Sequence, residues 1–134
     1  MEVTKTTIRV LFIGDIFGML GKRILAERLP SLLEQERIDC CIANGENAAG
    51  GNGLTSNLAK KFRKFGINVI TGGNHSFSVP DKDFDFMNQP HILRPLNYPE
   101  GNPGHGSTIY ELPSGIKVGV VNLIGRTFLH EIPD

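Results

Sequence analysis

Three short polar clusters in this 134-residue chain each follow an apolar run. They are Gly14-Asp15, Asn44-Gly45-Glu46-Asn47 and Gly73-Asn74-His75. Together they offer two carboxylates, several amide oxygens and an imidazole. This oxygen-rich set suits Mg²⁺, Mn²⁺ or iron better than a closed thiolate zinc site. The chemistry requires that the clusters meet in the fold.

The residue types predict distinct roles in a two-metal site. Asp15 and Glu46 would supply anionic oxygens, and Glu46 could bridge two cations. Asn74 would supply a neutral carbonyl oxygen, and Asn47 could do the same. Two cations would clamp a phosphate and activate a water molecule, and His75 would be placed to protonate the leaving oxygen.

Each of these residues also has a structural explanation. An Asp after a strand can cap a helix, Glu46 lies among the Asn and Gly residues typical of turns, and a single His is often only a hydrogen-bonding group. A phosphate-binding loop over residues 14–21 is disfavoured, because its glycine spacing misses the dinucleotide fingerprint and Asp15 would repel a pyrophosphate. The shared position of the clusters after three strands favours the metal site.

The elements that must position the clusters are alternating strands and helices. Apolar runs predict strands over Ile8–Ile13, Ile38–Ala43 and Ile67–Ile70, the first of them covered on both faces. If these strands are parallel neighbours, their carboxyl ends lie at one edge of the sheet, where open α/β folds place their sites.

Two helices are predicted between these strands. The first covers about residues 21–37 and is expected to kink at Pro30; its apolar face comprises Ile24, Leu25, Leu29, Leu32 and Leu33. The second follows an N-cap at Thr55 and stops at Gly66; its apolar side comprises Leu58, Phe62 and Phe65.

The pattern changes toward the C-terminus. A short helix over Pro80–Asn88 and a fourth strand at Ile92-Leu93 are followed by strands over 108–112 and 116–123, joined by the turn Pro113-Ser114-Gly115. The prediction is one α/β domain over residues 1–134, with a mostly parallel sheet that ends in a β-hairpin.

Composition narrows the function classes. Fourteen basic and fourteen acidic residues cancel, so we expect no basic nucleic-acid-binding surface and no membrane attraction. The apolar runs are too short to span a membrane and the N-terminal segment is polar, so a cytoplasmic location is expected. Cys40 and Cys41 are adjacent in a predicted strand and would point to opposite faces, which predicts two inert, buried thiols.

Several longer strings occur together: Ile13–Ile16, Asn44–Gly51, Gly53–Thr55, Gly73–His75, Arg94–Pro99, Pro103–Gly106 and Asn122–Phe128. In this combination the chain resembles the YmdB-like branch of the calcineurin-like metallophosphoesterases. The resemblance runs from Ile8 to about Leu129, and Asn-Gly-Glu-Asn-Ala-Ala-Gly is a very specific string.

The resemblance implies a two-metal phosphodiesterase that acts on cyclic nucleotides, notably 2′,3′-cyclic ones. The implied fold is the N-terminal half of a four-layer α/β/β/α sandwich. Asp15 and Asn47 would hold the first metal, Glu46 would bridge, Asn74 would hold the second, and His75 would be the general acid. The implied cofactors are two divalent cations, Mn or Fe with Mg as the alternative, and the implied substrate is a phosphodiester or cyclic nucleotide.

One departure from the family is expected to matter. The family completes its site with three histidines from a second half beyond Asp134, and neither His91, His105 nor His130 matches a ligand motif. Phe17 stands where the broader superfamily often has a His, a difference that the YmdB-like branch tolerates. We therefore expect an incomplete site, little or no turnover by this chain alone, and an apolar face covered by a second copy or by a complementing C-terminal half.

Two other functions stay open at this point. The chain could be a non-catalytic binding or oligomerisation module that keeps the metallophosphoesterase fold. A nucleotide-binding module that needs no metal is the more distant alternative.

Overall fold

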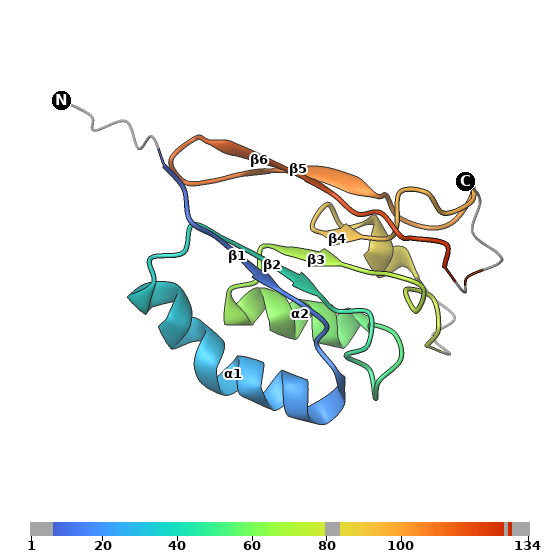
Figure 1. Cartoon of the computed structure of the whole chain (residues 1–134), viewed down its shortest axis with the longest axis horizontal. Helices are drawn as coiled ribbons and strands as arrows, with labels where there is room; N and C mark the ends of the chain where they lie inside the picture. The colour runs from blue at the N-terminus through green and yellow to red at the C-terminus, as the bar shows by residue number, and fades with distance from the viewer. Residues whose placement is uncertain (1–6, 80–83, 128, 130–134) are drawn as a thin grey trace.

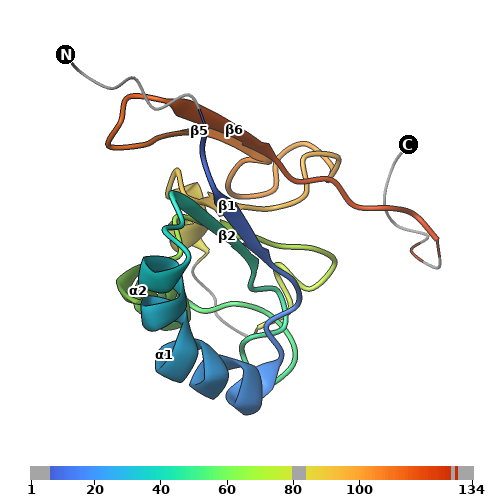
Figure 2. The same ribbon diagram turned by 60° about the vertical axis from the view of Figure 1, so that its left-hand side comes forward.

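The structure of the chain is a computed structural model that describes residues 7–79, 84–127 and 129. These residues form three layers, namely a pair of α-helices, a four-stranded parallel sheet and a two-stranded hairpin (Figures 1 and 2). The α/β class and the mostly parallel sheet with a terminal hairpin are thereby confirmed.

The parallel sheet places the three polar clusters at one edge. Its strands, in spatial order, are β1 (Val10–Ile13), β2 (Cys40–Asn44), β3 (Val69–Thr71) and β4 (Ile92–Leu93). The register pairs Ile13 with Ala43 and Asn44 with Thr71, so β1, β2 and β3 end side by side. The loops that follow them therefore leave the same edge of the sheet, as predicted.

Each of these three strands begins two residues later than the apolar pattern predicted, at Val10, Cys40 and Val69. Ile67 shows the reason, because its side chain is fully buried although it precedes β3. Apolar character follows burial, whereas the bounds of a strand follow backbone pairing.

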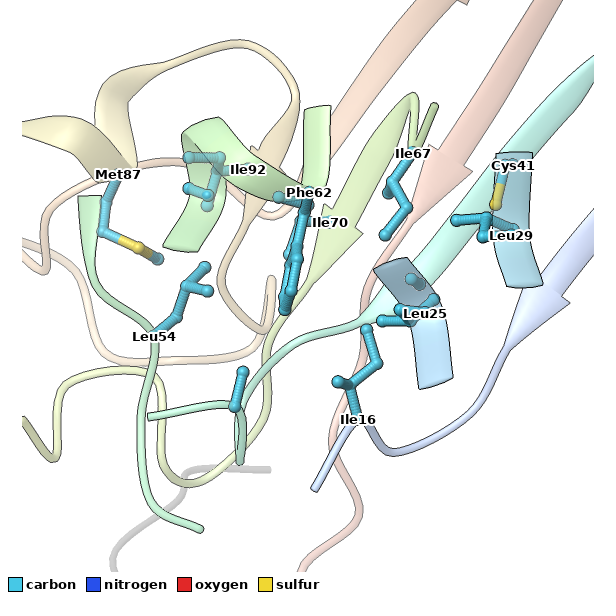
Figure 3. Packing of buried hydrophobic residues seen from close by; sticks show 13 residues of the cluster. Ile16, Leu25, Leu29, Cys41, Leu54, Phe62, Ile67, Ile70, Met87 and Ile92 are labelled. Carbon is cyan, nitrogen blue, oxygen red and sulfur yellow. The ribbon is translucent and has the colours of Figure 1, made fainter. Parts of the chain in front are cut away.

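The helices α1 (Gly18–Gln35) and α2 (Ser56–Phe65) cover one face of the sheet (Figure 2). The core between helices and sheet includes Leu29, Cys41, Phe62 and Ile70 (Figure 3). Complete burial of each large apolar side chain stabilises the fold by about 2 kcal/mol. The packing of the helices on the sheet therefore holds in place the strands whose ends carry the polar clusters.

Helix α2 has the ends that the sequence predicted. The Thr55 Oγ1 accepts a hydrogen bond of 3.3 Å from the backbone N–H of Leu58, and Gly66 ends the helix with a left-handed φ of 105°. Helix α1 begins at Gly18, three residues before its predicted start, and ends at Gln35. It continues through Pro30, as its predicted range implies.

The predicted apolar face of α1 was too wide. Leu25 and Leu29 are buried and Leu33 is partly buried, whereas Ile24 and Leu32 are exposed. The sheet therefore covers a narrower stripe of the helix than the periodicity suggested.

The prediction that the first strand is covered on both faces was wrong. The side chain of Phe12 in β1 is 61% exposed. The hairpin packs on β2, β3 and β4 through Cys40, Val69 and Leu93, and β1 lies at the edge of the sheet. Phe12 is thus left without a cover in the described part of the chain.

The hairpin forms a layer of its own and does not extend the first sheet. Its strands β5 (Ser107–Glu111) and β6 (Lys117–Val121) are antiparallel. Cys40 faces this layer and Cys41 faces the helices, and both are buried free thiols, as predicted.

The remaining elements are short. A 3₁₀ helix, η1 (Asp85–Asn88), occupies the end of the helix predicted over Pro80–Asn88, while residues 80–83 lie outside the described residues. Across the described ranges, no helix has both the length and the apolarity needed to cross a bilayer.

Candidate active site

The loop that carries Asp15 is tied to the loop after β2. The backbone N–H of Ile16 donates to the carbonyl of Asn44 at 3.1 Å, and that of Gly18 donates to the carbonyl of Asn47 at 3.0 Å. The Asn47 Nδ2 donates to the Asp15 Oδ1 at 2.9 Å. The first two clusters are therefore in direct contact.

The carboxylate of Glu46 joins the second cluster to the third. Its Oε1 accepts from the Asn44 Nδ2 at 3.3 Å, and its Oε2 accepts from the backbone N–H of His75 at 3.1 Å. The carboxylate lies directly against Gly73, where an added Cβ would collide with it. A glycine at position 73 is therefore needed for this approach.

The ring of His75 is oriented by Asn47. The His75 Nδ1 lies 2.6 Å from the Asn47 Oδ1. Because a carbonyl oxygen can only accept, Nδ1 carries the hydrogen in this pair, and Nε2 is the ring atom left for proton exchange. One amide side chain thus links Asp15 to His75.

Asn74 is exposed and lines a groove between the parallel sheet and the hairpin. The groove has a volume of about 830 Å³ and is also lined by Glu46, Phe12 and Asn122. The structure thus brings Asp15, Asn47, Glu46 and His75 into one hydrogen-bonded chain, with Asn74 beside it.

The donor set fits a hard divalent cation, because it consists of carboxylate and amide oxygens. Among the described residues, no three His, Cys, Asp or Glu side chains gather in a group that could hold a metal ion. A cation at this edge would therefore need the amide oxygens of Asn47 and Asn74 as well as the carboxylates of Asp15 and Glu46.

The other histidines lie in different surroundings. His91 directly precedes β4, at the opposite edge of the sheet from the clusters, and burial followed by the charge of Arg63 lowers its pKa. The carbonyl of His105 accepts from the backbone N–H of Arg94 at 3.0 Å. His130 lies outside the described residues.

Two residues that contact the site were missed by the predictions. The Tyr98 hydroxyl donates to the carbonyl of Gly73 at 2.9 Å, and the Asn122 Nδ2 donates to the carbonyl of Gly72 at 3.0 Å. Burial, followed by the charge of Glu46, raises the pKa of Tyr98. Both residues occur in strings that carry the family resemblance, but spacing alone assigned them no role.

Comparison with curated proteins identifies relatives of known name. A 2′,3′-cyclic-nucleotide 2′-phosphodiesterase of Bacillus subtilis (strain 168) is 41% identical over 128 residues, which are 95% of this chain and 48% of that protein. A putative phosphatase/phosphodiesterase of Mycoplasma genitalium is 36% identical over 125 residues, which are 90% of this chain and 44% of that protein. The chain spans about half the length of the curated relatives it matches.

Solved structures show the same fold. A hypothetical protein from Thermus thermophilus matches with a TM-score of 0.84 and 37% identity, over 95% of this chain and 49% of that one. A novel phosphatase from Mycoplasma pneumoniae matches with a TM-score of 0.77 and 31% identity, over 88% of this chain and 43% of that one.

The family model for YmdB-like proteins matches residues 11–134, which include every residue of the candidate site. This match, the curated relatives and the solved structures all agree with the family strings found in the sequence. The chain therefore belongs to the YmdB-like family.

Proposed function

We propose that this chain is part of a metal-dependent phosphodiesterase that hydrolyses cyclic nucleotides, with 2′,3′-cyclic nucleotides as the first candidates. The observation that carries the proposal is the hydrogen-bonded chain from Asp15 through Asn47 to His75, with Glu46 bonded to the backbone of His75. Relatives named as a phosphodiesterase and as putative phosphatases or phosphodiesterases support it.

The ligand roles follow the chemistry of the donors. Asp15 and Asn47 would hold a first cation, Asn74 a second, and Glu46 would bridge the two, with Mn²⁺ or iron expected and Mg²⁺ as the alternative. When bound, the two cations supply positive charge for a phosphodiester and lower the pKa of a water molecule.

Four side chains are too few to fill the coordination of two such cations. We therefore infer that further ligands come from additional polypeptide. Either a complementing C-terminal half, as the greater length of the relatives suggests, or a second copy of the chain would supply them.

The role proposed for His75 is proton transfer to the leaving oxygen. Since Nδ1 donates to the Asn47 Oδ1, the proton would be held at Nε2 and delivered from there. Asn47 fixes the plane of the ring, and the Asp15 Oδ1 in turn holds the amide of Asn47. The residues of this chain would thus orient the acid as well as bind the cations.

Metal binding tests the proposal directly. We expect the chain to bind Mn²⁺ weakly, and the variant Glu46→Gln to lose more than about tenfold in affinity, because loss of even a hydrogen-bond partner of a ligand costs about that much. Glu34→Gln, which changes an exposed carboxylate at the end of α1, is the matched control and should bind as the unmodified chain does. Calorimetry and Mn²⁺ electron paramagnetic resonance measure both affinities.

One result would contradict the proposed site, and another would contradict the inference that its ligand set is incomplete. Unchanged Mn²⁺ binding after Asp15→Ala combined with Glu46→Gln would refute the site. Rapid hydrolysis of 2′,3′-cyclic AMP by the homogeneous chain, abolished by Glu46→Gln, would confirm the chemistry but refute the incomplete ligand set.

A second candidate function is a non-catalytic binding or oligomerisation module. The observation that favours it is the exposed apolar surface beside the site, which includes Phe12, Val121 and Leu123. A chain that binds no Mn²⁺ but associates through this surface would support the module over the enzyme.

A further inference from the structure

The turn Gly72–Ser76 carries Asn74 and His75, and two side chains from distant segments hold its carbonyl groups. We propose that Tyr98 and Asn122 are positioning residues that fix this turn, and with it Asn74 and His75, relative to Glu46 and Asn47. The inference rests on the proposed function in so far as it assigns the turn to a metal and proton-transfer site.

Tyr98 holds the turn at Gly73. Its hydroxyl donates to the Gly73 carbonyl at 2.9 Å, and the same carbonyl accepts from the Ser76 Oγ at 2.8 Å. The ring of Tyr98 is itself fixed, because it lies against Phe77 with 5.9 Å between the ring centroids. Burial, followed by the charge of Glu46, raises the pKa of Tyr98 and so favours the protonated hydroxyl that donates this bond.

Asn122 holds the turn one residue earlier. Its Nδ2 donates to the Gly72 carbonyl at 3.0 Å and to the Leu93 carbonyl at 3.3 Å. Its own backbone is anchored twice, since its N–H donates to the carbonyl of Gly106 at 2.8 Å and its carbonyl accepts from the N–H of Leu96 at 2.7 Å. The backbone of Asn122 is therefore held in place, and its side-chain amide contacts Gly72 from a defined position.

Asn97 joins the segments that carry these two residues. Its Nδ2 donates to the carbonyl of Ile124 at 2.8 Å, and its Oδ1 accepts from the N–H of Ile124 at 3.1 Å. The segments 94–99 and 122–127, to which the ligand set assigns no role, are thereby joined, and Tyr98, Asn97 and Asn122 together form what we call the bracket of the turn.

The turn needs such a bracket because of its two glycines. An added Cβ at Gly73 would collide with the Glu46 carboxylate, and one at Gly72 would collide with the Ser76 Oγ. Glycine is thus required for close approach, yet it is also the residue with the greatest backbone freedom. Hydrogen bonds to the carbonyls of Gly72 and Gly73 restrict that freedom, and a displacement of about 1 Å at a reacting group can cost about a hundredfold in rate.

Amide hydrogen exchange in the metal-free chain tests the bracket itself. Tyr98→Phe removes one hydroxyl, and we expect the His75 and Ser76 amides to exchange about fivefold faster, the factor that one net hydrogen bond represents. Tyr110→Phe is the matched control, because the Tyr110 hydroxyl accepts from the Asn68 Nδ2 at 2.8 Å and lies away from the turn. Asn122→Ala should accelerate the same two amides.

A general loss of stability would raise exchange throughout the core, whereas loss of the bracket raises it at the turn alone. Unchanged exchange at His75 and Ser76 in both Tyr98→Phe and Asn122→Ala would overturn the inference, whether or not the chain binds metal.

Broadening of amide signals by Mn²⁺ tests the link to the site. We expect Tyr98→Phe and Asn122→Ala to weaken Mn²⁺ binding and Tyr110→Phe to leave it unchanged. Faster exchange at the turn with unaltered Mn²⁺ affinity would overturn the positioning role. If the unmodified chain binds no Mn²⁺, the proposed function fails instead, and the exchange measurement still decides whether the bracket exists.

Discussion

Asn47 uses both ends of its amide, since its Nδ2 donates to Asp15 and its Oδ1 accepts from His75. A carboxylate at this position could not donate to Asp15, and an aliphatic side chain could serve neither partner. The Asn47 carbonyl oxygen has two lone pairs, so it can accept from His75 and still contribute to a cation. At the scale of single residues, this amide accounts for the meeting of the first and third clusters.

The thiol of Cys41 gives a prediction about pH. Burial, followed by the charge of Cys40, raises the pKa of Cys41 from 9.0 to about 12. Above pH 9 the unfolded chain loses this proton while the folded chain keeps it, so the contribution to stability is complete below pH 9 and is lost as the pH rises toward 12. We expect the free energy of unfolding, measured in urea, to fall more steeply between about pH 9 and about pH 11 in the unmodified chain than in Cys41→Ala.

The two slopes are the quantities to compare, because Cys41→Ala also leaves a small cavity that lowers stability at every pH. Parallel pH profiles for the two proteins would contradict the prediction.

At the scale of elements, the ends of α2 place the loops on either side of it. Thr55 begins the helix directly after the loop of the second cluster, and Gly66 ends it three residues before β3. An added Cβ at Gly66 would collide with Leu33 of α1. The two ends therefore set where α2 begins and ends in the sequence, and Gly66 also allows it to pack closely against α1.

The N-cap of α2 gives a prediction about stability. Thr55→Ala removes the acceptor for the Leu58 N–H and should lower the free energy of unfolding by about 1 kcal/mol. Thr55→Ser retains an oxygen at the same position and should lose clearly less. Urea unfolding of the three proteins measures both effects, and equal losses in the two variants would show that the hydroxyl does not cap the helix.

Local signals in the sequence were enough to predict most of these elements. The cap at Thr55, the stop at Gly66 and the turn Pro113-Ser114-Gly115 each depend on one to three adjacent residues, and the structure confirms each of them. The convergence of the clusters was also predictable, because parallel neighbouring strands end at a common edge.

Other features depend on contacts between residues far apart in the sequence and could not be predicted from the local pattern of residue types. The exposure of Phe12 reflects the position of the hairpin over β2, β3 and β4. The contacts of Tyr98 and Asn122 with the turn join residues 25 and 50 positions apart in sequence. Periodicity carries no information about contacts between distant segments, so the bracket could be found only in the three-dimensional structure.

At the scale of the whole molecule, the groove between the parallel sheet and the hairpin has an apolar rim. Phe12 and Leu123 line it and are largely exposed, and Glu46 and Asn74 lie in the same groove. Exposed apolar surface beside polar groups often marks an interaction site. The exposed apolar surface is thus continuous with the candidate site.

We expect this surface to make the isolated chain associate and bind a hydrophobic dye. Light scattering should show a mass that rises with concentration, and 8-anilinonaphthalene-1-sulfonate should fluoresce in its presence. Phe12→Asp should reduce both signals, whereas Met19→Asp, at a side chain of α1 that is 78% exposed, should leave them unchanged. Both substitutions replace exposed side chains, so a change in stability within about 0.5 kcal/mol is expected for each and would not account for a difference. A monomer of constant mass that binds no dye would show that the groove needs no cover, and the proposal of additional polypeptide would then rest on the proposed metal coordination alone.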